Sequence, residues 1–192
     1  MEILNFITNF IRIDIFLSFG FYSIIYFILR TFLKDKVFIL DFDKSATELI
    51  IYLGFVWLVL WLIGTWIYYL GLENKIEQIK YYELLTGKYA YAIWIQPIFW
   101  FLLTQVYRIK FIKKYLIFRI IISLFFIVTF ERFVILITLF HRDYLPSNWT
   151  LDNKYGIDTN NLILGLLGKI LVIIMIISLY HFGIKKIKTL FS

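Results

Sequence analysis

The 192-residue chain contains no cysteine and only two prolines. Without cysteine it can form no disulfide, no thiolate metal site and no cysteine nucleophile. It also contains no Walker loop and no GxGxxG, HExxH or GxSxG motif, so no nucleotide-binding loop, zinc-protease helix or hydrolase elbow is recognisable. We therefore predict no catalytic residue and no metal site that belong to this chain alone.

Residue types with GC-rich codons are scarce. The chain has 9 glycines and 2 prolines, against 21 phenylalanines and 14 tyrosines. Alanine and arginine are also few, whereas isoleucine, lysine and asparagine, which have AT-rich codons, are common. This usage indicates an AT-rich genome, either that of an organelle or that of certain bacteria.

Apolar residues make up 61% of the chain, and the mean hydropathy is +0.82. Soluble domains are about 45–50% apolar, and a core of this size cannot bury the excess. A lipid bilayer is therefore the expected solvent. The net charge of +7 comes from basic residues that lie between apolar runs and form no basic face, so we expect no nucleic-acid partner.

A membrane-spanning helix needs about 20 mostly apolar residues. Five runs meet this requirement: 14–33, 47–72, 89–107, 116–140 and 161–184. We predict an all-α, polytopic integral membrane helical bundle with about five transmembrane helices, forming one transmembrane domain over residues 1–192. Ser45 and Thr47 are predicted to cap the start of the second span, and residues 1–13 to form an interfacial lead-in.

The distribution of basic residues predicts how the five spans are oriented. One side carries eleven of them: Arg30, Lys34, Lys36, Lys44, Arg108, Lys110, Lys113, Lys114, Lys185, Lys186 and Lys188. The other side carries six: Arg12, Lys75, Lys80, Lys88, Arg142 and Lys154. The N-terminus is therefore expected outside, and the C-terminus on the cytoplasmic or matrix side of a bacterial cytoplasmic or mitochondrial inner membrane.

Two adjacent charges, Glu131 and Arg132, lie inside the fourth predicted span. Glu131 is roughly 13 Å from the outer end of that span at 1.5 Å per residue. Ionisable groups at this depth face a bundle interior and pair with one another or with neighbouring helices. Two interpretations remain open: a polar pocket that handles a proton or a quinone headgroup, and a buried pair that fixes helix packing.

His141, Arg142 and Asp143 follow at the outer end of the same span. All three are candidates for a quinone or proton site, with His141 and Asp143 at its outer exit, Glu131 as the proton-handling or pairing carboxylate and Arg132 as its counter-ion or a contact to a partner subunit. The alternative is a ladder of interfacial charges. His181 is expected near the opposite membrane face, so a haem held by both histidines is disfavoured.

Two further cations lie within apolar runs. Arg119 is expected to extend along the helix to the inner interface. Lys169 is expected to face the bundle, with Glu131 or Asp143 as a partner.

The segment FERFVILITLFHRDYLPSNW, residues 130–149, resembles a run in the NrfD-like (polysulfide reductase) membrane subunits of alternative complex III, the bacterial quinol:electron-acceptor oxidoreductase. YYELLTGKYAYAIWIQPIFWF, residues 81–101, is similar to the family segment that contains GPYAW, although residues 87–91 here read GKYAY. LDFDKSATELI, residues 40–50, corresponds to the start of the preceding helix, and the resemblance extends over about 14–185.

Family members have eight to ten spanning helices in two four-helix bundles, and this chain resembles the second bundle only. The family's quinol site is attributed mainly to the first bundle, so its residues have no counterpart here. The resemblance implies a membrane-anchor role in a respiratory assembly.

We therefore expect an integral membrane subunit of a respiratory quinone-linked oxidoreductase, which anchors and lines a quinone or proton site. The alternative is a non-catalytic structural subunit of a mitochondrial respiratory or ATP-synthase complex. Either way, the expected partners are other subunits of a hetero-oligomeric complex and membrane lipids. A quinone is the one cofactor suggested, and it would be shared with the complex.

Overall fold

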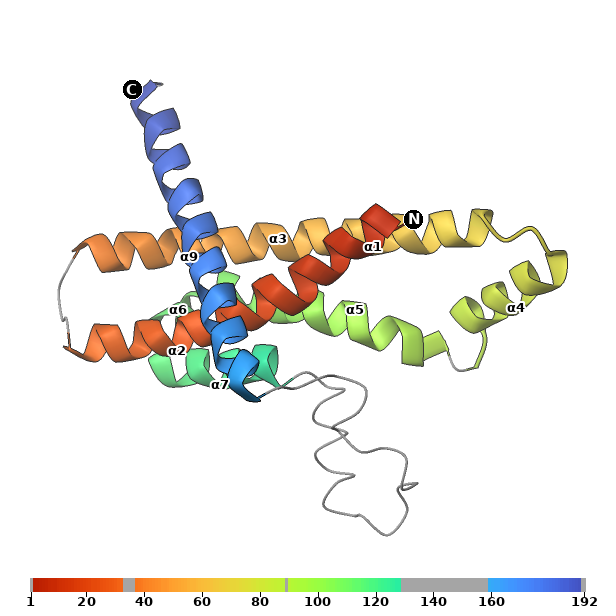
Figure 1. The fold of residues 1–192 in the computed structure, drawn as a ribbon, viewed down its shortest axis with the longest axis horizontal. Coiled ribbons are helices and arrows are strands. Elements are labelled where there is room, and N and C mark those ends of the chain that lie inside the picture. The colour runs from red at the N-terminus through yellow and green to blue at the C-terminus, as the bar shows by residue number, and fades with distance from the viewer. Residues whose placement is uncertain (1, 33–36, 89, 129–158, 191–192) are drawn as a thin grey trace, which may run out of the picture.

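The computed structural model describes residues 2–32, 37–88, 90–128 and 159–190 (Figure 1). Every regular element in these ranges is a helix, as the sequence predicted. The helices are α1 (Glu2–Asn9), a π-helix (Phe10–Phe16), α2 (Leu17–Phe32), α3 (Val37–Leu70), α4 (Lys75–Thr86), α5 (Ala90–Gln105), a 3-10 helix (Val106–Arg108), α6 (Lys110–Lys114), α7 (Leu116–Ile127) and α9 (Thr159–Leu190).

Three helical stretches among the described residues are long and apolar enough to cross a membrane: Glu2–Phe32, Val37–Leu70 and Leu164–Ile184. The shorter stretch Ile117–Ile127 is equally apolar, and the rest of the predicted fourth span lies outside the described residues. The five-span count stays a prediction.

The second long helix begins ten residues earlier than predicted. The predicted start at Thr47 is wrong, because α3 begins at Val37 and Ser45 and Thr47 lie inside it. Their hydroxyls donate hydrogen bonds back to the carbonyls of Asp41 and Lys44, at 3.2 and 2.9 Å. This back-bonding satisfies both hydroxyls within a helix, so neither is needed as a cap.

Residues 2–16 belong to the first long helix and are more than a lead-in. The π-helix Phe10–Phe16 joins α1 to α2 without a break in the helical chain. A π-helix widens the helical turn and departs from the regular hydrogen-bond ladder. Just before it, the indole nitrogen of Trp57 on α3 donates to the Thr8 carbonyl at 3.1 Å, which ties this irregular turn to α3.

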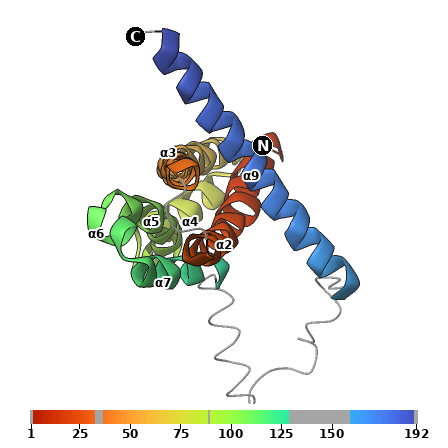
Figure 2. The same cartoon turned by 90° about the vertical axis from the view of Figure 1, so that its left-hand side faces the viewer.

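The helices up to α7 form a bundle that α9 crosses. In Figures 1 and 2, α2, α3, α5 and α7 run along the long axis of the molecule, and α9 passes over α2 and α3 at a steep angle. α2 packs on α7, and α3 packs on α5. The face of α9 that meets the bundle carries Ile173, Ile177 and His181, which recur every four residues and are buried.

Aromatic side chains form the centre of the bundle. Phe16 contacts Trp100 and Phe126, with ring centroids 5.5 and 5.8 Å apart, and Phe19 meets Tyr107 edge to face at 5.2 Å. All five rings are almost fully buried. Edge-to-face and offset arrangements of this kind add to the stabilisation that burial provides.

Glycine permits two close helix contacts in this bundle. A Cβ built on Gly20 of α2 would lie 2.9 Å from the Ser123 carbonyl oxygen of α7. A Cβ on Gly54 of α3 would overlap the side chain of Thr104 on α5. Small residues at helix–helix contacts let backbones approach closely, which drives packing where lipid removes the hydrophobic driving force.

Candidate functional site

The most buried charges among the described residues are Asp43 of α3 and Arg119 of α7. The Arg119 guanidinium donates two parallel hydrogen bonds of 2.6 Å, one to each Asp43 carboxylate oxygen. The Arg119 side chain is 2% exposed, and the Asp43 side chain is 12% exposed. A bidentate geometry of this kind is the strongest form of an arginine–carboxylate pair.

Tyrosines and serines complete the surroundings of this pair. The Tyr22 hydroxyl donates to Asp43 at 3.3 Å, and the guanidinium carbon of Arg119 lies 4.5 Å from the centre of the Tyr26 ring. The Tyr107 hydroxyl is 3.3 Å from the Ser123 hydroxyl, which donates to the Arg119 carbonyl. We call this set the Asp43–Arg119 cluster: Tyr22, Ser23, Tyr26, Asp43, Tyr107, Arg119 and Ser123.

Each part of the cluster comes from the buried stripe of a different helix. Asp43, Thr47, Ile50 and Trp57 repeat at helical spacing along α3 and are all buried. On α7, Arg119, Ser123 and Phe126 do the same. The cluster therefore joins α2, α3, α7 and the 3-10 helix at one point.

The expected extension of the Arg119 side chain out of the protein toward an interface is wrong. Its side chain is enclosed by Tyr26, Tyr107 and Asp43 and does not extend to the surface. The bidentate carboxylate and the two tyrosine rings are the groups that offset the cost of desolvating this guanidinium.

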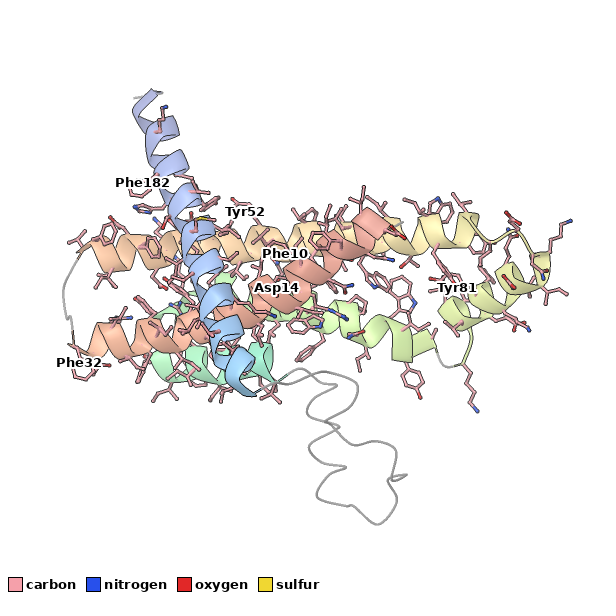
Figure 3. The ribbon with its side chains drawn as sticks, in the orientation of Figure 1. Phe10, Asp14, Phe32, Tyr52, Tyr81 and Phe182 are labelled. Carbon is pink, nitrogen blue, oxygen red and sulfur yellow. The ribbon has the colours of Figure 1, made fainter. Side chains whose placement is uncertain are left out.

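A second ion pair joins α9 to the π-helix. The Lys169 ammonium lies 2.7 Å from an Asp14 carboxylate oxygen, and about a third of each side chain is exposed (34% and 32%). Figure 3 labels Asp14, which lies where α9 crosses the N-terminal helix. Lys169 faces the bundle as predicted, but its carboxylate partner in the described structure is Asp14, which the sequence analysis did not single out.

His181 is also buried in a helix contact. Its Nδ1 lies 2.8 Å from the Ser45 hydroxyl of α3, and the rings of Phe38 and Phe42 lie beside it. No hydrogen-bond partner is present for its Nε2 within the described structure. The histidine therefore helps to hold α9 against the first turns of α3.

The residues singled out from sequence as a quinone or proton site lie elsewhere. Glu131, Arg132, His141, Arg142 and Asp143 all fall in 129–158, outside the described residues. Their proposed roles stay predictions. Within the ranges that the structure describes, no group of three or more acidic or histidine side chains could hold a metal ion.

Sequence reasoning missed Asp43 because the predicted helix began after it. The signal was present: extending the apolar stripe of α3 upstream from Ile50 through Thr47 places Asp43 on the buried face.

In the described residues every regular element is a helix, three apolar helices are long enough to span a membrane, and one buried ion pair joins α3 to α7. No protein-family model, no curated protein and no solved structure matches the chain.

Proposed function

We propose that this chain is a structural, membrane-embedded subunit of a larger hetero-oligomeric complex in an energy-transducing membrane. The observation that carries the proposal is the Asp43–Arg119 cluster. The Asp43 carboxylate and the Arg119 guanidinium are hydrogen-bonded to each other and enclosed by tyrosines, so this ion pair joins α3 to α7. We infer that in this chain the pair specifies that α3 and α7 meet, and in what register.

The surface of α3 supports the membrane setting. Tyr52, Phe55 and Trp66 are 60%, 55% and 64% exposed, although all three lie in a helix of 34 residues. Water would penalise so large an apolar surface, whereas acyl chains or other membrane subunits would cover it. The five-span topology with the N-terminus outside belongs to this proposal.

A respiratory quinone-linked oxidoreductase is the complex that the sequence resemblance suggests, and a mitochondrial respiratory or ATP-synthase complex is the alternative. In the first, Glu131 and its neighbours would line a quinone or proton site. The geometry of the Asp43–Arg119 cluster favours a scaffold role in either complex.

The structural role predicts a specific outcome for Asp43→Asn and Arg119→Gln in the native host. Each variant should lower the amount of assembled complex several-fold, because each leaves a buried charge without its counter-charge. The complex that does assemble should turn over at the normal rate per molecule. Quantitative native gels combined with activity measurements test this, and Arg108→Gln, at an exposed arginine, serves as the control.

Normal amounts of complex with slow turnover in Asp43→Asn or Arg119→Gln would contradict the structural role. That result would place the cluster in the chemistry of the complex.

A further inference from the structure

A groove of about 200 Å³ is lined by residues of α1, α3 and α4. Its walls include Asn5 and Thr8 of α1 and Trp61 and Thr65 of α3. Tyr81 of α4 closes one side, at the end of the molecule where Figure 3 labels it. Three separate helices thus line one groove.

The aromatic walls of the groove are fixed by neighbouring rings. Trp61 meets Trp94 of α5 edge to face at 5.3 Å, and the ring of Tyr68 lies 4.9 Å from that of Tyr81. The Trp94 indole in turn donates to the Leu85 carbonyl at 3.0 Å. Rings held in this way need little reordering when a ligand binds, which lowers the entropic cost of binding.

The polar groups of the groove are neutral and include both hydrogen-bond donors and hydrogen-bond acceptors. The Thr8 and Thr65 hydroxyls donate to carbonyls of their own helices, so their oxygens remain acceptors. The Asn5 side chain, at the exposed rim, contributes an amide that can donate. Burial raises the pKa of the Tyr81 phenol, partly offset by its hydrogen bond with Thr65, so this hydroxyl stays protonated at neutral pH.

We propose that this groove binds the head of a neutral amphiphile: a single six-membered ring that carries a hydroxyl or carbonyl oxygen and an apolar tail. The proposal goes beyond the structural role and does not depend on it. Among the described residues, no charged side chain lines the groove, so they offer a phosphate headgroup no counter-ion.

The volume of the groove and the exposed apolar side chains on its helices fit this class of ligand. A cavity of about 150 Å³ holds benzene, so a groove of about 200 Å³ accommodates one substituted ring. The same helices carry exposed apolar side chains, such as Ile3 at 76% and Ile63 at 44%, on which a tail can lie.

The test uses the full chain purified in a neutral detergent and titrated with a benzoquinone that carries a ten-carbon tail. Quenching of the fluorescence of the chain's six tryptophans reports binding, and the variants below show whether this binding depends on the groove that Trp61 lines. We expect saturable quenching in the unsubstituted chain. Gly64→Leu, whose new side chain projects into the groove beside Leu4, should weaken binding at least about tenfold.

Gly183→Leu is the matched control, because a Cβ at Gly183 meets nothing within 4 Å, and it should bind like the unsubstituted chain. Tyr81→Phe keeps the ring but removes the phenol oxygen, and it should weaken binding roughly three- to tenfold.

Non-saturable quenching, or equal affinity in Gly64→Leu and Gly183→Leu, would overturn the proposal. If Gly64→Leu fails to fold, unchanged affinity in Tyr81→Phe would overturn it instead. Tighter competition by an anionic phospholipid than by an uncharged phenol with the same tail would reject the neutral class of ligand.

Discussion

Replacing Arg119 with methionine is expected to destabilise the chain by roughly 3–5 kcal/mol, the usual cost of removing one partner of a buried ion pair. The Asp43 carboxylate would keep the hydrogen bond from Tyr22 but lose both hydrogen bonds from the guanidinium. Its uncompensated charge would lie where α2, α3 and α7 meet, so all three contacts should loosen together.

A double variant separates the cost of an unpaired charge from the value of the pair. Asp43→Leu combined with Arg119→Met removes both charges and keeps apolar volume, and such replacements are often neutral or stabilising. We expect the double variant to regain most of the stability that Arg119→Met loses. Thermal unfolding in mild detergent, monitored by circular dichroism, measures the stability of the single and the double variant.

Arg108→Met is the control for the loss of an exposed arginine, and its stability should change by no more than about 0.5 kcal/mol. If Arg119→Met matched this control, or if the double variant were as unstable as the single one, the cluster would not hold the bundle together.

Gly54→Ala should produce the second largest effect, a loss of about 1–3 kcal/mol from overpacking. The added methyl group would collide with the Thr104 side chain, including its Cβ, which cannot move without the α5 backbone. α3 and α5 would therefore have to separate. The same thermal unfolding measurement reports the change.

Gly183→Ala is the matched helical glycine, because its Cβ would lie in open space. Alanine is the better helix former by about 1 kcal/mol, so this variant should be as stable as the unsubstituted chain or more stable. We expect the stability change to be of opposite sign at the two positions, a loss for Gly54→Ala and no loss or a gain for Gly183→Ala. A stabilised Gly54→Ala would show that α3 and α5 do not approach closely at this point.

The helical class and the C-terminal ends of the first three predicted spans were predictable, because they depend on local composition and on where an apolar run stops. The predicted ends 33, 72 and 107 lie within two residues of Phe32, Leu70 and Gln105. Helix α4 was not predicted, since its apolar residues form no run, although Asn74 caps it by accepting a hydrogen bond from the Ile76 amide.

Which charged residues form ion pairs with each other could not be predicted from the sequence. Arg119 lies 76 positions from Asp43, and depth in an apolar run does not say which carboxylate a cation meets. The same holds for Lys169, whose partner Asp14 lies in a π-helix that no periodicity indicated. The crossing of α9 over the bundle likewise depends on tertiary contacts such as Ser45–His181.

The most direct test of the account is the mass of the particle that contains this chain after gentle extraction of its native membrane with a mild detergent. Mass photometry combined with mass spectrometry of the co-purified chains gives both mass and composition. We predict a particle far heavier than one 23.2 kDa chain in its detergent micelle, with several other membrane proteins in fixed proportion. A single monodisperse chain in its micelle would contradict the proposed role as a subunit.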